Sequence, residues 1–209
     1  MTNPPQPEQA MTWPFPTPGP ILATAYQDIY LAAEGNNTQK QLIGDPNLLP
    51  KPWDPPTCRN PQLRAALWVW LEQVVTWINH EYTWDPENLI PPCWPQHPHL
   101  VHEIAVLADQ RRRAGIALDS NTLEEWHRYT LPSFQDRMKT RLKTHCDQHH
   151  QPWPAKPRHT RHTNHQHHQT RQNTYNQDLQ TIQPPPHNPH TPPTHTTQTR
   201  SHQRGRRRY

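Results

Sequence analysis

Apolar residues recur at steps of three and four along one stretch, and this spacing predicts a long amphipathic helix that ends at about Tyr82. Asn60 and Pro61 come directly before it, as a helix-capping side chain and a proline in the first turn, where the missing N–H costs nothing. Because a stripe of large side chains must be buried, we expect this helix to form the centre of the fold. The stripe consists of Leu63, Leu67, Trp70, Leu71, Val74, Trp77, Ile78 and Tyr82.

A second helix is predicted to begin at His97 and Pro98 and to end before Gly115. Its last turn holds the arginines 111–113, and cations at that end of a helix are stabilised by its dipole. We expect its buried face to consist of Leu100, Val101, Ile104, Leu107 and Ala108.

A third helix is predicted from the Ser-Asn-Thr sequence at 120–122, which Glu124 and Glu125 follow as in a capping box. Pro132 is expected to kink or restart this helix, because an interior proline loses a hydrogen bond and clashes with the preceding turn. The apolar positions of this stretch are Leu123, Trp126, Leu131, Phe134, Met138 and Leu142.

The two ends of the chain differ from this middle part. Residues 1–56 are rich in proline and contain one short helical pattern at about 21–33, and residues 44–61 are predicted to be an extended linker. Residues 151–209 hold too few large apolar side chains to offset the entropy of ordering. The predicted fold class is therefore all-α: a small three- or four-helix domain over residues 57–150, flanked by the proline-rich N-terminal region and by a disordered basic tail over residues 151–209.

Composition supports this division. Only 31% of the 209 residues are hydrophobic, whereas an average globular domain is nearly half apolar, so one core cannot extend over the whole chain. Residues 151–209 hold 9 lysines and arginines against a single acid, Asp178, which gives the tail a charge of +8. The net charge is +4, so residues 1–150 carry −4.

The sequence contains neither a signal-peptide pattern nor an apolar run of the roughly 20 residues that span a membrane. We therefore expect a soluble, cytoplasmic protein with no membrane partner. Its three cysteines are an odd number, and we expect them to be reduced.

Metal binding is one candidate chemistry, with Cys93, His97, His127 and Cys146 as candidate ligands. Zinc prefers four nitrogen or sulfur ligands in a tetrahedron, and Cys146 also begins a Cys-x-x-His-His segment that offers His149 or His150. The paired Cys-x-x-Cys spacing typical of zinc sites is missing. Cys93 is equally explained as a small buried side chain, and His97 as a helix cap. No cofactor other than this possible zinc is predicted.

Catalysis by Cys93 with His97 or His127 as its base would require a hydrogen bond that sequence proximity does not establish. The nucleotide-binding and hydrolase motifs are missing, so we expect a non-enzymatic protein, with no catalytic residues assigned.

Nucleic-acid binding is predicted for the basic tail and for the basic face of the last helix of the domain. Each lysine or arginine that neutralises a phosphate releases a counterion, so such a surface binds without sequence preference and in a salt-dependent way. The candidate residues are Arg137, Lys139, Arg141, Lys143, Arg200, Arg204, Arg206, Arg207 and Arg208. The tail is also His-rich, which suggests weak metal chelation, and it is equally explained as a passive extension.

A protein-interaction or adaptor role is the alternative. Proline-rich segments at 3–20 and 45–56 can adopt extended conformations that dock into aromatic grooves of an unknown protein partner. The sequence does not indicate an oligomeric state.

The segment Pro-Pro-Cys-Trp-Pro-Gln-His-Pro at 91–98, followed by Leu100, Val101, Glu103 and later Trp126-His127, resembles an uncharacterised family of small proteins from Actinobacteria. The resemblance covers about residues 60–146. It implies a small α-helical domain of unknown function, carried by actinobacterial chromosomes and by mobile elements such as plasmids or phages. Our functional prediction is thus a non-enzymatic accessory protein of such a chromosome or element that binds nucleic acid weakly through its tail.

Overall fold

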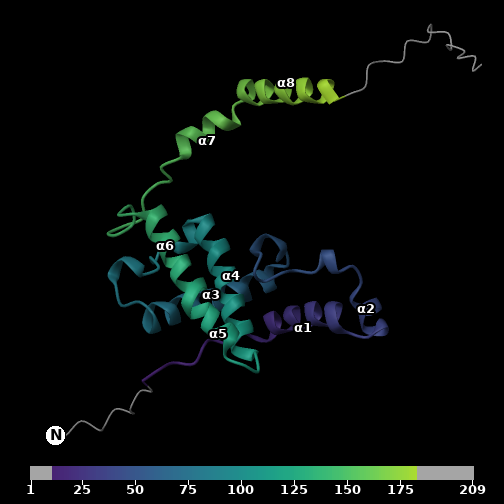
Figure 1. Ribbon diagram of the computed structural model, residues 1–209, viewed down its shortest axis with the longest axis vertical. Helices are drawn as coiled ribbons and strands as arrows, with labels where there is room; N and C mark the ends of the chain where they lie inside the picture. The colour runs from purple at the N-terminus through teal and green to yellow at the C-terminus, as the bar shows by residue number, and fades with distance from the viewer. Residues whose placement is uncertain (1–10, 183–209) are drawn as a thin grey trace, which may run out of the picture. The chain divides into compact units, whose positions relative to one another are not determined.

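The computed structural model describes residues 11–182, which fall within two compact units, Met1–Pro152 and Trp153–Tyr209. The described residues form α-helices and short helical turns and contain no strand, so the predicted all-α fold is confirmed (Figure 1). Within residues 11–182, no helix has both the length and the apolar character needed to cross a membrane.

Helix α3 (Pro61–Glu81) is the predicted central helix. The Asn60 side chain caps it by accepting hydrogen bonds from the backbone N–H groups of Gln62 at 2.8 Å and Leu63 at 3.2 Å. All of the predicted stripe is buried except Tyr82, which lies just beyond the helix and is half-buried. Val75, outside the predicted stripe, is buried as well, and α3 contacts both α1 and α4.

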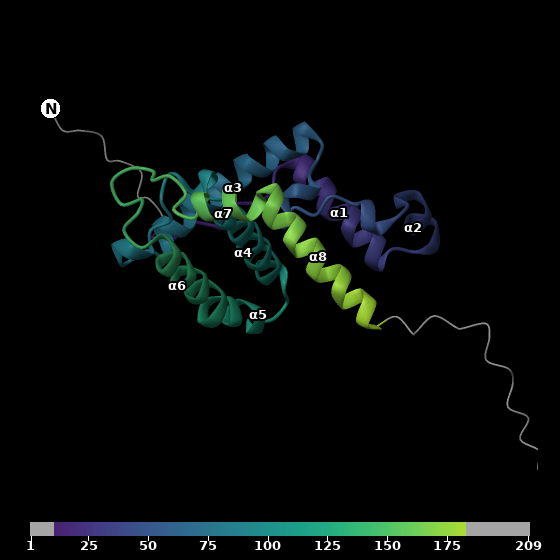
Figure 2. The same ribbon diagram turned by 90° about the horizontal axis from the view of Figure 1, so that it is seen from above.

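Helix α4 (Pro98–Ile116) lies between α3 and a second arm of the domain. That arm consists of α5 (Asn121–Glu125), a π-helical turn η5 (Trp126–Thr130) and α6 (Leu131–Leu142). Figure 2 shows α4 and α6 as two limbs of a hairpin that α5 joins. Trp126 is buried in this hairpin, and its indole N–H donates to the carbonyl of Leu107 at 3.3 Å.

The start of the third helix differs from its prediction in one respect. No side chain caps α5 at Ser120, and the amide of Asn121 instead donates to Asp119 Oδ1 at 2.9 Å, so the predicted capping box is wrong. Pro132 restarts the helix as predicted, because it lies in the first turn of α6, where a proline needs no N–H partner.

The predicted short helix of the N-terminal region is α1 (Pro20–Glu34), and it packs on α3 through buried Leu22 and Ala25. A further helix, α2 (Asn37–Ile43), was not predicted. Asn36 starts it through a capping box with Gln39, so the asparagines that signal the end of α1 also begin the next helix.

Residues 44–60 are more compact than the predicted linker. They form two short 3-10 turns, η1 (Pro46–Leu48) and η2 (Pro55–Thr57), and they bury Pro52, Pro55 and Cys58. The Thr57 hydroxyl holds the loop together, since it accepts from the Lys51 amide at 2.7 Å and donates to the Asp54 carbonyl at 2.7 Å.

Two of the three arginines of α4 pack sideways, although all three were predicted to be cations of the last helical turn. The guanidinium carbon of Arg112 lies 3.7 Å from the centre of the Tyr26 ring, and its Nη2 bonds the buried carboxylate of Asp109 at 2.9 Å. The guanidinium of Arg111 lies over the rings of Phe15, Trp77 and Trp126. Only Arg113 stands in the last turn.

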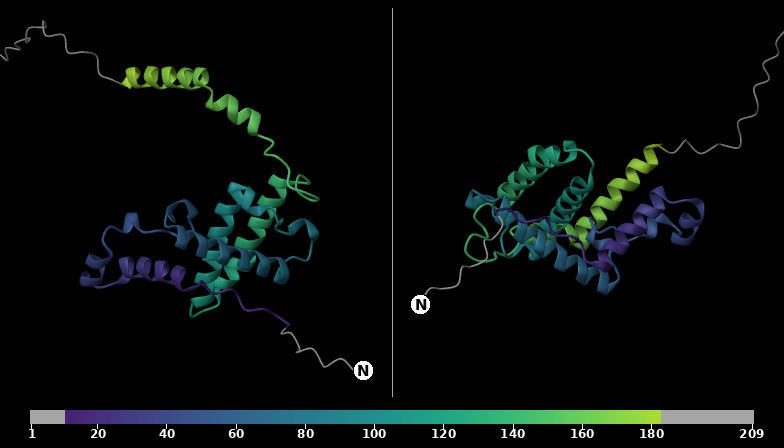
Figure 3. Two further views of the ribbon diagram at one scale, coloured as in Figure 1. Left: turned by 180° about the vertical axis from the view of Figure 1, so that it is seen from behind. Right: turned by 90° about the horizontal axis from the view of Figure 1, so that it is seen from below.

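In the second unit, α7 (Lys156–Thr163) and α8 (His165–Ile182) differ from the predicted disorder (Figure 3). Neither helix buries a side chain, as their composition requires. Local interactions define them instead: Gln and Arg favour helices, and the Asn164 side chain accepts from the Gln166 amide at 2.8 Å. The rest of the predicted tail, residues 183–209, lies outside the described residues.

Candidate metal centre

The loop between α3 and α4 presents Cys93 and His97 on a rigid frame. Two short 3-10 turns, η3 (Pro86–Asn88) and η4 (Trp94–Gln96), shape this loop. Trp94 anchors it, because its ring is buried against Trp68 and its indole N–H donates to Glu72 Oε2 at 3.2 Å. Cys93 precedes η4 and His97 precedes α4, so both ends of the short turn are fixed by helix geometry.

The segment that follows α6 supplies the other half of the site. Lys143 ends α6 with φ 49°, a backbone region that a non-glycine residue rarely adopts. The chain then turns tightly, with the His145 amide donating to the Leu142 carbonyl at 2.9 Å. This turn directs Cys146 back toward the α3–α4 loop, where only 9% of its surface is exposed.

Four side chains converge at this point: Cys93, His97, Cys146 and His150. His97 Nε2 lies 3.3 Å from Cys93 Sγ and 3.4 Å from Cys146 Sγ, and all four potential ligand atoms are within 4.8 Å of one another. For zinc bonds of about 2.1 Å to nitrogen and about 2.3 Å to sulfur, a tetrahedron places neighbouring nitrogen and sulfur atoms about 3.6 Å apart. The two nitrogen–sulfur distances are therefore close to those of a tetrahedral zinc site, and the other two ligands are near enough to complete it.

The protonation states favour metal binding by neutral imidazole. The pKa of His97 is lowered, mainly by burial and secondarily by the neighbouring His150 and His99. Burial also lowers the pKa of His99, with a smaller effect from Arg141. Burial is the main influence on the pKa of Cys93 and raises it. The neighbouring Cys146 thiol raises this pKa further. A bound cation would act in the opposite direction on the thiols, since it stabilises the thiolate.

His150 offers an independent sign that the cluster is built for a ligand. Its Nδ1 is buried and has no hydrogen-bond partner within the described residues. A buried polar atom without a partner costs on the order of 1–3 kcal/mol, and coordination or a hydrogen bond from a metal-bound group would remove that cost.

The structure thus brings together three of the four predicted ligands and adds His150. His127 lies elsewhere, where its Nε2 is 3.0 Å from the Tyr82 hydroxyl. His149 is exposed and contacts Gln151 instead of the cluster. The Cys-x-x-His-His spacing indicated His149 and His150 equally, and the direction of the turn after α6 decides between them.

The pair of Cys93 and His97 also matches the arrangement of a nucleophile and its base, with 3.3 Å between Sγ and Nε2. The electrostatics oppose that role. A reactive cysteine needs a lowered pKa, whereas burial raises the pKa of Cys93 and only 8% of its surface is exposed. The contact is therefore better explained by two ligands of one metal.

The predicted basic face of α6 is largely engaged in ion pairs. Arg137 and Arg141 both bond the carboxylate of Glu103 on α4, and Lys139 pairs with Glu87. Lys143 lines a cavity of about 620 Å³ beside Cys146. The remaining predicted residues, Arg200, Arg204, Arg206, Arg207 and Arg208, lie outside the described part of the chain.

No protein-family model matches the chain, and no curated protein or solved structure shows a significant similarity to it. The resemblance to the actinobacterial family accordingly stays a prediction.

Proposed function

We propose that the helical domain is a zinc-binding module in which Cys93, His97, Cys146 and His150 hold one zinc ion. The observation that carries the proposal is the convergence of two thiols and two imidazoles from segments 49 residues apart, with all four ligand atoms within 4.8 Å of one another. Two thiolates balance the charge of Zn²⁺, and mixed sulfur and nitrogen ligands in this geometry favour zinc over harder cations.

The role of this zinc is structural. Four protein ligands complete a tetrahedron and leave no position for water or substrate, which a catalytic zinc site requires. The ion would connect the α3–α4 loop, which Trp94 anchors, to the segment after α6, which has few other buried contacts. The ion would thereby fix the last residues of the first unit against the α3–α4 loop.

Cobalt(II) titration of the full chain, purified without a metal-affinity step, tests this proposal. Tetrahedral cobalt with thiolate ligands gives strong visible absorption and a sulfur-to-metal charge-transfer band. We expect one such site per chain and its loss when zinc is added. An octahedral cobalt spectrum without a charge-transfer band would contradict the proposal.

The chain offers a matched control within one dipeptide. His150→Gln should weaken cobalt binding at least about tenfold, whereas His149→Gln should leave it unchanged, because only His150 belongs to the cluster. His127→Gln should also leave the spectrum unchanged. Cobalt bound to the exposed histidines of α7 and α8 would have no thiolate ligand. It would therefore not contribute to the charge-transfer band.

Weak nucleic-acid binding is the second candidate function, and the exposed basic side chains of α7 and α8 favour it. Residues 153–182 carry Lys156, Arg158, Arg161 and Arg171 against the single acid Asp178. None of these side chains is buried, so all can reach phosphates. The ion pairs of Arg137, Lys139 and Arg141 make α6 a weaker contributor than the tail.

Binding of duplex DNA across a salt series tests this second function with two charge-matched variants. Arg158→Gln/Arg161→Gln should reduce the slope of log affinity against log salt by about 1.8, because two phosphate contacts are lost. Arg137→Gln/Arg141→Gln removes the same charge and should change the slope little. Equal slopes for all three proteins would contradict a role of α7.

A further inference from the structure

Residues 13–18, Trp-Pro-Phe-Pro-Thr-Pro, lie along α3 as an extended strap. Every second residue is proline, whose ring fixes φ near −65°, and each intervening residue precedes a proline, which excludes the helical region for it. Such an alternation favours the polyproline II helix, which has three residues per turn and leaves its carbonyls unpaired. The strap, defined as residues 13–18, therefore offers hydrogen-bond acceptors at a spacing of three residues.

Two tryptophans of α3 use this spacing. The indole N–H of Trp77 donates to the carbonyl of Trp13, and that of Trp70 donates to the carbonyl of Pro16, both at 2.9 Å. Trp70 and Trp77 are seven residues apart, about 10.5 Å along one face of a helix. The two carbonyls are three residues apart, about 9.3 Å along a polyproline II helix. The two indole donors of the helix and the two carbonyl acceptors of the strap are thus spaced at similar distances.

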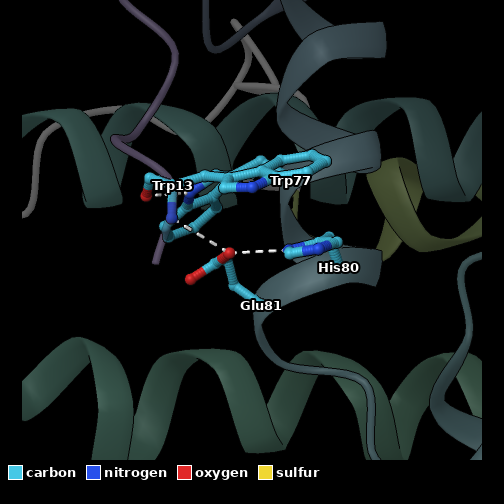
Figure 4. A network of polar contacts seen from close by, with 4 residues as sticks. All are labelled: Trp13, Trp77, His80 and Glu81. Carbon is cyan, nitrogen blue, oxygen red and sulfur yellow. Dashed lines mark hydrogen bonds and ion pairs between the residues drawn. The ribbon is translucent and has the colours of Figure 1, made fainter. Parts of the chain in front are cut away.

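Side chains of the strap add aromatic contacts at both positions. The Trp13 ring stacks on His80 with 3.6 Å between ring centres and 9° between planes, and its amide donates to Glu81 Oε1 at 3.1 Å (Figure 4). The Phe15 ring meets Trp77 edge-on at 5.1 Å and Trp70 at 6.4 Å. Trp13 and Phe15 are therefore the aromatic anchors of the strap on α3.

The strap lies on the domain as a ligand would, since none of its residues is buried. Trp13 keeps 38% of its surface exposed, while Trp70 and Trp77 beneath it keep 1% and 4%. The core contains no residue of the strap, and Phe15 only packs against it from outside. Removing the strap would thus uncover two indole N–H groups and the aromatic side chains of two core residues, Trp70 and Trp77.

We propose that this face of α3, formed by Trp70, Trp77, His80 and Glu81, is a recognition groove for extended peptides of the pattern Trp-Pro-Phe-Pro. The strap occupies the groove in cis, and the partner in trans is a proline-rich segment of another protein with the same two aromatic anchors. The groove lies outside the metal cluster and does not depend on it. The indole donors select an extended backbone, and the His80 ring and the Phe15 site select the aromatic side chains.

Calorimetric titration with a synthetic peptide of residues 11–18 tests the proposal on the full chain. The variant Trp13→Ala/Phe15→Ala, whose own strap lacks both anchors, should bind the peptide at least about tenfold more tightly than the wild-type chain does. The reason is that a tethered strap competes at an effective concentration in the millimolar range. Equal affinity for both proteins, or no saturable binding to the variant, would overturn the proposal.

Two controls keep the result interpretable. Adding Trp77→Phe to the variant keeps an aromatic ring but removes one indole donor, and it should weaken peptide binding at least about fivefold, as expected for loss of one hydrogen bond. A peptide with both anchors replaced by alanine should not bind. Far-UV circular dichroism of each variant verifies its helices. If the variant loses its helical signal, Trp13→Ala alone is used, with the same order of affinities expected.

A concentration-dependent dimer of the wild-type chain that the peptide cannot dissociate would also overturn the assignment. Such a dimer would mean that the groove is covered by a second copy of the chain.

Discussion

Cys146 Sγ lies 3.4 Å from His97 Nε2, although the two residues are 49 positions apart in the sequence. His97 belongs to a loop that tryptophan and proline side chains hold rigid, and Cys146 belongs to a turn that ends in an exposed segment. The contact joins a firm part of the domain to a weakly held one. Metal binding should therefore affect the segment after α6 more than the α3–α4 loop.

Zinc should protect the segment after α6 from hydrogen exchange. If opening of residues 144–150 breaks the site, a free zinc concentration about 100 times the dissociation constant should slow amide exchange there about 100-fold. Mass spectrometry of exchange in the full chain measures this effect. Cys146→Ser should abolish it, whereas the amides of α3 should exchange alike with and without zinc.

Zinc binding should release about two protons at neutral pH, because each thiol must ionise to coordinate the metal. Burial raises the pKa of Cys93, so this thiol holds its proton until the metal arrives. The lowered pKa of His97 means that its imidazole is already neutral and releases no proton. Affinity should therefore increase with pH around neutrality. Calorimetry in buffers of different ionisation enthalpy counts the protons, and a release near zero would contradict thiolate coordination.

Without metal, the two cysteines of the cluster should form a disulfide when treated with diamide. Cys93 and Cys146 each lose one hydrogen, and diamide takes up both as it is reduced to its hydrazine. A disulfide needs about 2.05 Å between sulfurs, so the segment after α6 must move inward. Zinc should prevent the reaction by holding both thiolates. Peptide mapping identifies the product, and Cys58→Ser serves as the control, because Cys58 is buried in a different loop.

Two tryptophans permit a matched test of the core. Trp126 keeps 2% of its surface exposed and contacts Trp77 and Tyr82, so Trp126→Ala should lower the free energy of unfolding by about 3–5 kcal/mol. Trp84 is 99% exposed, and Trp84→Ala should change the free energy of unfolding by no more than about 0.5 kcal/mol. Urea unfolding followed by circular dichroism measures both. Similar losses for the two variants would contradict the packing of the hairpin.

The helices could be predicted from the sequence where burial and capping act on the same residues. Asn60 and the stripe from Leu63 to Ile78 gave α3 its start and its buried face, because both depend on local spacing. The predicted capping box at Ser120 is wrong: no side chain caps the helix there, and Asp119, one residue earlier, accepts a hydrogen bond from the amide of Asn121. Local rules do not determine which of two neighbouring acceptors a turn brings closer.

The candidate metal site could be predicted only in part, for a geometric reason. Cys93 and His97 share a five-residue loop, so their proximity is local. The choice of His150 over His127 depends on the turn at Lys143 and on the side of α6 from which the chain returns. The sequence predicts the strap only as a ligand for other proteins, because the match between Trp70, Trp77 and its carbonyls exists only after folding.

The guanidinium of Arg111 lies 5.2 Å from the ring centre of Phe15, 5.4 Å from that of Trp77 and 5.7 Å from that of Trp126. One cation thus touches the strap, the central helix and the π-helical turn at once. Departure of the strap would remove one of the three rings that surround this cation, so the position of the Arg111 side chain depends on whether the strap is docked.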